Sequence, residues 1–204
     1  MELNINVDIK EEDWLYSLNE QQRATLSQVD KARVLSLFSR PSRVETAKQS
    51  LRSLVMGLPE DQDISLVTFN SCSAPPSRQG PFLGKQHADL LQYIEDLEVD
   101  GGTPLATSLE AAASMVDGKN RDAIVVAFLD GEDGCDRNQC EVAARIAEKQ
   151  PRLTFNVVDI SGRGLSDCIA KESGGRIYTA RDTTHITEAL QQSVLAIPKN
   201  THCP

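Results

Sequence analysis

Three short and almost uninterrupted apolar runs limit most strongly what this chain can fold into. They are ISLVTFN at 64–70, AIVVAFLD at 123–130 and LTFNVVDI at 153–160, and a weaker fourth, GRIYTA, lies at 175–180. Strands that are apolar on both faces are typical of parallel sheets, because helices cover both sides of such sheets. The runs therefore predict a parallel sheet buried between two layers.

Amphipathic helical patterns separate these runs. Strands that alternate with helices through short loops form right-handed crossovers. We therefore expect an α/β fold, a doubly wound and mostly parallel sheet with helices on both faces, in which the Pro- and Gly-rich stretch 73–84 is a connector. The expected helices lie at 42–58, 85–97, 103–116, 140–150 and 184–197.

The first forty residues follow a different pattern. Residues 1–9 alternate strictly between apolar and polar side chains, which predicts a half-exposed edge strand or ribbon. Residues 11–40 predict one or two amphipathic helices that pack on one side of the sheet. We expect three parts: an atypical N-terminal insertion of ribbon plus helices at 1–40, an α/β domain at 41–198 and a tail at 199–204.

Composition excludes several classes of function. The net charge of −9 and the scattered Lys and Arg residues argue against nucleic-acid binding. We expect no membrane span, because no apolar run reaches eighteen residues, and the start of the chain has no signal-peptide pattern. An enzyme is not expected, since the sequence lacks a P-loop, a dinucleotide fingerprint and a nucleophile elbow. The three histidines, His87, His185 and His202, are interpreted as surface residues.

Five cysteines are present, and their spacing fits no zinc site. A disulfide in an oxidising compartment is favoured over a set of buried thiols. Cys135 and Cys140 are placed to brace the loop after the second apolar run, and Cys168 is a further partner for either of them. The connectivity stays open at this stage. The five are Cys72, Cys135, Cys140, Cys168 and Cys203.

Polar residues follow each predicted strand and should meet at one edge of the sheet, where ligands bind in folds of this kind. Ser71 follows the first run, and Asp130 and Asp133 follow the second. A carboxylate at the end of a buried strand needs hydrogen-bond donors or a cation. Oxygen ligands of this type suit Mg²⁺.

Thr103 precedes Pro104 at the start of a regular helical pattern. Thr followed by Pro is typical of a helix N-cap with proline at the first helical position. The cap accounts for the Thr-Pro pair but not for the acidic cluster that ends the most apolar strand. A second interpretation is that the Thr103 hydroxyl holds a ligand at the edge of the sheet.

The stretches GGTPLATSLEAA at 101–112 and AIVVAFLDGEDGC at 123–135 resemble the second and third parts of the metal-ion-dependent adhesion site of von Willebrand factor type A (vWA) domains. The resemblance extends over roughly residues 40–197 and implies a vWA fold of Rossmann-like type. It implies Thr103 and Asp130 as ligands of Mg²⁺, or of Mn²⁺ or Ca²⁺. Asp133, Asp8 and Ser71 are secondary candidates at this metal rim.

The same resemblance implies a protein–protein interaction or adhesion module. In such domains an Asp or Glu carboxylate of a partner protein completes the metal shell. A structural vWA-like module with a degenerate metal site is the alternative, and a metal-assisted hydrolase is less favoured. Similar bacterial domains with cysteines in these loops imply a periplasmic or otherwise extracytoplasmic setting.

Two departures from the family pattern affect the expected site. Leu129 stands where the family usually has Ser or Thr, and the Asp-x-Ser-x-Ser motif that ends the family's central strand is missing. We expect that the chain starts inside that motif. Residues 2–9 would then replace the central strand and bring Asp8 to the rim, or the sheet would expose its edges and the metal would be absent.

Overall fold

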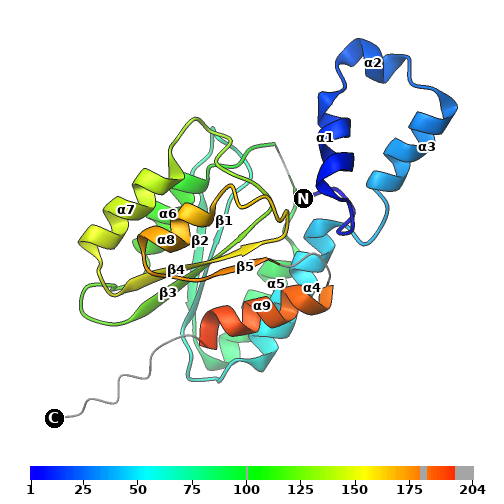
Figure 1. Ribbon diagram of the computed structural model, residues 1–204. Helices are drawn as coiled ribbons and strands as arrows, with labels where there is room; N and C mark the ends of the chain where they lie inside the picture. Colours follow the sequence, from blue (N-terminus) through cyan, green and yellow to red (C-terminus); the bar gives the residue numbers. More distant parts are fainter. Residues whose placement is uncertain (100, 180–182, 196–204) are drawn as a thin grey trace.

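Three of the four apolar runs form the predicted parallel sheet, whereas the run at 64–70 pairs with a neighbour in an antiparallel sheet, so the prediction of a parallel strand there was wrong. The computed structural model describes residues 1–99, 101–179 and 183–195 (Figure 1). Strands β3 (Ala123–Leu129), β4 (Leu153–Asp159) and β5 (Ile177–Thr179) form one parallel sheet in the order β3-β4-β5. Strands β1 (Ile64–Thr68) and β2 (Ser77–Phe82) form a separate antiparallel pair.

Strand β2 lies in the stretch that we predicted to be a connector, so that prediction was wrong. Its residues are mostly exposed, as expected for a polar edge strand. Because they lack an apolar pattern, the sequence did not predict a strand here. The ladder with β1 is irregular between Ile64 and Leu66. Gly80 lies opposite, with φ +103°, and a Cβ there would come within 2.9 Å of the Ile64 carbonyl oxygen, so this close approach requires glycine.

Helices cover both faces of the strands, which gives three layers (Figure 1). On one face lie α4 (Arg43–Gly57), α5 (His87–Glu95) with the short 3₁₀ turn η1 (Gly84–Gln86) before it, and α9 (Thr183–Leu195). On the other face lie α6 (Leu105–Ala113), α7 (Gln139–Lys149) and α8 (Asp167–Glu172). The doubly wound α/β prediction is confirmed.

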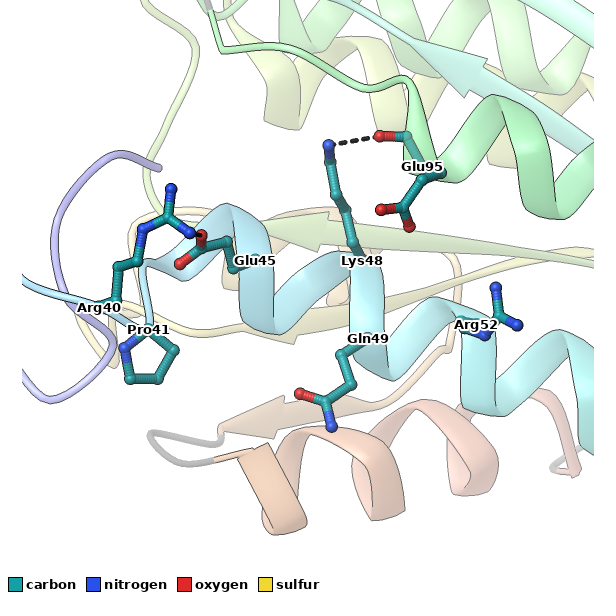
Figure 2. A pocket seen from close by; sticks show the side chains of 7 residues that line it. All are labelled: Arg40, Pro41, Glu45, Lys48, Gln49, Arg52 and Glu95. Atoms are coloured by element: carbon teal, nitrogen blue, oxygen red, sulfur yellow. Dashed lines mark hydrogen bonds and ion pairs between the residues drawn. The ribbon is translucent and has the colours of Figure 1, made fainter.

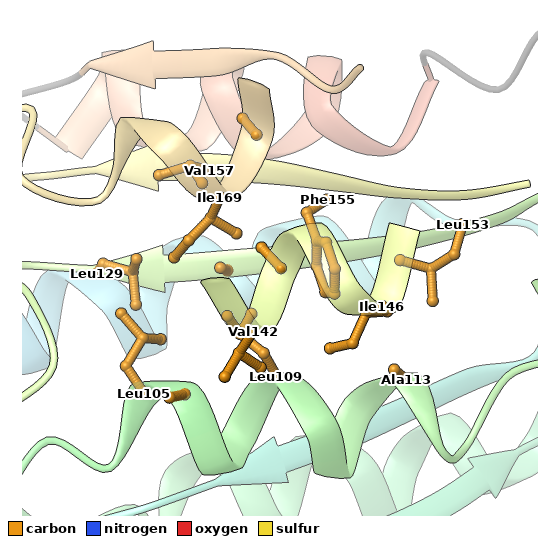
Figure 3. Packing of buried hydrophobic residues seen from close by; sticks show 14 residues of the cluster. Leu105, Leu109, Ala113, Leu129, Val142, Ile146, Leu153, Phe155, Val157 and Ile169 are labelled. Carbon is orange, nitrogen blue, oxygen red and sulfur yellow. The ribbon is translucent and has the colours of Figure 1, made fainter. Parts of the chain in front are cut away.

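The main core fills the space between β4 and the helices α6, α7 and α8. Phe155 and Val157 of β4 are completely buried there, against Leu109 of α6 and Val142 of α7 (Figure 3). Alternate residues of the same strand point to the opposite face, where Val158 packs among residues of α4 and α9. The unbroken apolar run of β4 therefore has a direct cause, since both of its faces are covered.

The first forty residues form a helical extension that projects from the α/β body (Figure 1). It consists of α1 (Ile9–Ser17), α2 (Glu20–Ala24) and α3 (Gln28–Leu37). Leu3, Leu15 and Leu37 form a small buried cluster that packs α1 and α3 against the first residues of the chain. The segment is helical as predicted, but it forms three helices instead of one or two. They project from the α/β body, so the prediction that they pack on one side of the sheet was wrong (Figure 1).

The ribbon predicted for residues 1–9 is not formed. Only an isolated bridge between Asn4 and Ser42 is present. The Asn4 side chain accepts a hydrogen bond from the Asn6 N–H at 2.8 Å, and its carbonyl accepts one from Val7, so the chain turns instead of extending. Asp8 then caps α1 by accepting from the N–H groups of the helix's first turn.

Residues 2–9 therefore do not replace a central strand, and Asp8 lies at the start of α1. The carbonyls of Met1 and Leu3 accept hydrogen bonds from Val44 and Arg43 at the start of α4. Binding to this helix terminus uses the backbone groups that a sheet would need. In the described part of the chain, no strand lies between β1 and β3.

Candidate functional site

A cavity of about 300 Å³ lies between β1 and β3, and we call it the slot. Leu66 and Val67 of β1 form one side, and Val125 to Leu129 of β3 form the other. Thr103, Asp130 and Met1 also line this cavity, at the end where β3 finishes. We call the loops around that end the rim. The structure thus brings Thr103 and Asp130, which come from different elements, to one cavity.

Two cationic groups neutralise the Asp130 carboxylate. The Met1 ammonium group donates a hydrogen bond to Oδ2 of Asp130 at 2.6 Å, and Nη1 of Arg43 lies 3.8 Å from the same oxygen. Arg43 is only 2% exposed, and its guanidinium group binds both carboxylate oxygens of Glu12 at 2.9 and 3.1 Å. Such a buried network needs every charge to be paired. Asp130 therefore already has internal counter-ions.

This donor set does not fit a divalent metal ion in the observed conformation. Mg²⁺ prefers about six oxygen ligands and a carboxylate free to bind it. Among the residues that line the slot at this end, one hydroxyl, from Thr103, and one carboxylate, from Asp130, are available, and the carboxylate lies near the Arg43 guanidinium group. Among residues 1–99, 101–179 and 183–195, no group of three or more His, Cys, Asp or Glu side chains is arranged to hold a metal.

The N-cap predicted for Thr103 is replaced by a carboxylate from the opposite loop. Helix α6 begins at Leu105, with Pro104 at the cap position. Oδ2 of Asp133 accepts a hydrogen bond from the Ala106 N–H at 2.8 Å, so Asp133 satisfies the helix terminus. Thr103 contributes its carbonyl, which accepts from Leu105 and Gly134, and no cap bond to its hydroxyl is formed.

The Asp133 carboxylate organises the loop that follows β3. Its Oδ1 accepts hydrogen bonds from the N–H groups of Cys135 and Arg137 at 2.8 and 3.2 Å. With Oδ2 on Ala106, both carboxylate oxygens bind backbone donors. The sequence suggested Asp133 as a metal-rim residue. In the structure its carboxylate links the loop after β3 to the start of α6 through hydrogen bonds.

Ser71 and Asp8, the other two candidates, make local contacts. The hydroxyl groups of Ser71 and Ser73 lie 2.9 Å apart, and Asp8 caps α1. The Ser71 loop packs closely against Gly102, where φ is +149° and a Cβ would lie 2.8 Å from the Cys72 amide nitrogen. This close approach explains one glycine of the Gly-Gly pair before Thr103.

Two disulfides are formed among the residues that the structure describes. Cys72–Cys135 joins the loop after β1 to the loop after β3, and Cys140–Cys168 joins α7 to α8. The sequence favoured disulfides and named Cys135, Cys140 and Cys168, but it missed Cys72 as the partner of Cys135. That pair is 63 residues apart, so only the convergence of the two rim loops reveals it. Cys203 lies outside the described residues.

A second hollow, on the outer side of α4, has a volume of about 610 Å³ (Figure 2). Two of its cationic side chains have partners in the hollow. Arg40 pairs with Glu45 at 2.9 Å, and Lys48 Nζ donates to the Glu95 carbonyl at 2.6 Å. This open surface has no buried polar group directed into it among the residues shown, so it is a weaker candidate than the slot and its rim.

The fold and the rim together define an α/β domain that gathers several loops at the carboxyl edge of its parallel strands, the class in which that edge binds ligands. The family model for the von Willebrand factor type A domain matches residues 27–132, just over half of the chain. The chain belongs to the von Willebrand factor type A domain family. The family assignment made from the Gly-Gly-Thr-Pro and Asp-Gly-Glu-Asp stretches is confirmed.

Solved structures share the fold at low sequence identity. An aerotolerance-related membrane protein from Bacteroides fragilis, with multiple mutations to serines, gives a TM-score of 0.63 at 16% identity and covers 78% of this chain and 91% of its own. The conserved hypothetical protein BatB from Bacteroides thetaiotaomicron gives 0.62 at 17%, with 76% and 88% covered. A comparison with curated protein sequences found no match.

A third structure carries a metal. It is proximal thread matrix protein 1 from the mussel byssus, described with a zinc-occupied MIDAS motif. It gives a TM-score of 0.56 at 14% identity and covers 74% of this chain and 39% of its own. At these identities the likeness shows the fold alone.

None of the helices described in the present chain is long and apolar enough to cross a membrane.

Proposed function

We propose that this chain is a protein–protein interaction module without catalytic activity, and that it binds its partner at the rim. The observation that carries the proposal is the convergence of Thr103 and Asp130 on one end of the slot. The Cys72–Cys135 disulfide ties two of the rim loops together. A loop surface held in this way loses little conformational entropy on binding.

The partner's chemistry depends on whether the rim holds a metal. In the family pattern, an Asp or Glu carboxylate of the partner would complete the shell of Mg²⁺, Mn²⁺ or Ca²⁺. In this chain the buried Arg43 guanidinium group already lies 3.8 Å from the Asp130 carboxylate and gives it a positive neighbour. This observation favours the second candidate, a vWA-like module with a degenerate metal site. We therefore infer that binding at the rim does not depend on a divalent metal.

An extracytoplasmic location is part of the proposal. Disulfides persist in oxidising compartments and are rare where glutathione and thioredoxin keep thiols reduced. Two disulfides, one of them at the rim itself, support this location. Comparing the free thiols of the chain after expression in the cytoplasm and in the periplasm would test it.

The metal question is tested by titrating Mg²⁺, Mn²⁺ and Ca²⁺ while the thermal unfolding midpoint is recorded. A ligand that binds only the folded state raises this midpoint by mass action. We expect no rise for the wild-type chain. A rise that is abolished in Asp130→Ala would contradict the degenerate site and support metal-dependent binding of a partner.

The interaction surface is tested with matched variants of the immobilised domain. Glu132→Arg changes an exposed side chain in the rim loop, whereas Arg152→Ala changes an exposed one just before β4, at the opposite end of the strand. Proteins retained from an extract of the source cells should be lost with the rim variant, kept with the control and unaffected by EDTA. Equal retention by both variants would contradict binding at the rim.

A further inference from the structure

The Cys72–Cys135 disulfide ties the loop after β1 to the rest of the rim. In the described part of the chain, no backbone hydrogen bond joins residues 70–75 to another element. The hydrogen bonds of the serine side chains in this loop stay within it, and Cys72 Sγ approaches the Gly134 carbonyl oxygen at 3.6 Å. The covalent bond to Cys135 is therefore the strongest link that holds this loop in place.

The loop after β3, on the other side of this disulfide, has several further attachments. The Asp133 carboxylate accepts three backbone hydrogen bonds, one of them from the first turn of α6. The Gly134 N–H donates to the Thr103 carbonyl oxygen at 2.9 Å. Loss of the disulfide would therefore leave the loop after β3 in place and would release residues 70–75.

The two disulfides differ in exposure and in the elements that they join. Cys72 is exposed and Cys135 is half-buried. Cys140 and Cys168 are both half-buried, and Cys168 packs against the main core. Their bond joins α7 to α8, and apolar residues of both helices are buried in that core. Because an attacking thiolate must reach a sulfur atom, the rim disulfide is the more open of the two to thiol–disulfide exchange.

We propose that Cys72–Cys135 is a reversible thiol–disulfide exchange site, and that its reduction by a dithiol releases the loop after β1 from the rim. A thiolate of the dithiol attacks Cys72 Sγ and forms a mixed disulfide. The Cys72–Cys135 bond breaks, and its electron pair passes to Cys135 Sγ, which takes up a proton. The second thiol of the dithiol then loses its proton and displaces Cys72, which takes up a proton in turn. The dithiol is oxidised to a disulfide, and the two cysteines are reduced.

This exchange would regulate binding at the rim, a consequence that rests on the proposed function. The released loop packs directly on the glycine pair before Thr103, since a Cβ at Gly102 would lie 2.8 Å from the Cys72 amide nitrogen. A partner that binds the reduced chain must order residues 70–75 again, and this ordering costs conformational entropy. The oxidised chain is therefore the form that binds the partner, and the reduced chain binds it more weakly.

Timed labelling of the thiols tests the exchange chemistry without a partner. The oxidised 204-residue chain, with Cys203→Ala so that no fifth thiol takes part, is treated with dithiothreitol, quenched with iodoacetamide at successive times and mapped by mass spectrometry. We expect Cys72 and Cys135 to be labelled at least about tenfold faster than Cys140 and Cys168, and to lose this reactivity when oxidised dithiothreitol replaces the reduced form. Equal rates for the two pairs, or faster labelling of the α7–α8 pair, would overturn the proposal.

Release of the loop is measured by backbone ¹⁵N heteronuclear NOE values, which report motion on the ps–ns timescale. Reduction of the wild-type chain should lower the values within residues 70–75 and leave those of the loop after β3 unchanged. The double variant Cys72→Ala with Cys135→Ala should give the lowered values without a reductant. Unchanged values within residues 70–75 after reduction would contradict the release, and this measurement needs only the wild-type chain if the double variant does not fold.

The effect on the rim is tested with immobilised variants in an extract of the source cells that contains no added reductant. Cys72→Ala with Cys135→Ala should retain less protein than the wild type, whereas the matched control, Cys140→Ala with Cys168→Ala, should retain as much. Equal retention by the rim variant and the wild type would show that the loop does not regulate binding. No retention by the oxidised wild type would contradict the proposed function alone, because the labelling and NOE measurements judge the exchange site separately.

Discussion

Oδ2 of Asp133 accepts a hydrogen bond from the backbone N–H of Ala106 at 2.8 Å, which joins the loop after β3 to the first turn of α6. The same carboxylate binds the N–H groups of Cys135 and Arg137. One side chain therefore caps a helix and fixes the rim loop that leads to the Cys72–Cys135 disulfide.

Replacement of Asp133 by alanine should lower the free energy of unfolding by about 1–2 kcal/mol, the usual cost of losing a helix cap. Urea unfolding at neutral pH measures this change. Glu132→Ala is the matched control, because Glu132 is the exposed neighbour in the same loop. A loss in Asp133→Ala no larger than in the control would show that the cap does not stabilise the domain.

The carboxyl group of Glu110 on α6 is held by Arg137 through two hydrogen bonds of 2.9 and 3.0 Å. These bonds lower the pKa of Glu110 from its ordinary value of 4.5. Because the folded-state pKa is the lower one, the stabilisation is present above the unfolded pKa and is lost as the pH falls through the folded pKa.

Glu110→Gln should therefore cost some stability at neutral pH and little at a pH below the lowered pKa. The loss at neutral pH should be under about 1 kcal/mol, because the pair is partly exposed and screened by solvent. Urea unfolding across this pH range measures the difference, with Glu148→Gln, at an exposed position of α7, as the control. A constant difference at all pH values would contradict the ion pair.

The Cys140–Cys168 disulfide spans 28 residues and joins two helices of the main core. The double variant Cys140→Ala with Cys168→Ala should lower the free energy of unfolding by roughly 2–4 kcal/mol, since it frees the unfolded chain from a closed loop of this size. Guanidinium unfolding of the oxidised wild type, the reduced wild type and the double variant checks this. Equal stability of all three would show that the disulfide contributes nothing.

Local patterns in the sequence were sufficient to predict most of the elements. The apolar runs gave β1, β3, β4 and β5, and α4 was expected at 42–58 and is found at Arg43–Gly57. These elements are predictable because burial on both faces of a strand, or on one face of a helix, produces a regular pattern of apolar residues along the sequence. Strand β2 was missed, because an exposed edge strand needs only a partner and no apolar pattern.

The contacts that form the site join residues far apart in the sequence, so no local sequence pattern could predict them. Met1 reaches Asp130 across 129 residues, and Cys72 reaches Cys135 across 63. Arg43 and Glu12 each lie in an amphipathic helix, where a charged residue ordinarily faces solvent, yet they form a buried pair. Thr103 and Asp130 were proposed from their motifs, and the structure places both at one cavity. Their counter-ions could not be found, because three-dimensional packing alone selects them.

The open slot between β1 and β3 is tested most directly by amide hydrogen exchange in the 204-residue chain, followed residue by residue by NMR. The amides of Ile124, Val126 and Phe128 should exchange much faster than those of Val125 and Ala127, which bond toward β4. Uniformly slow exchange along β3 would mean that a strand already occupies the slot and would contradict the divided sheet.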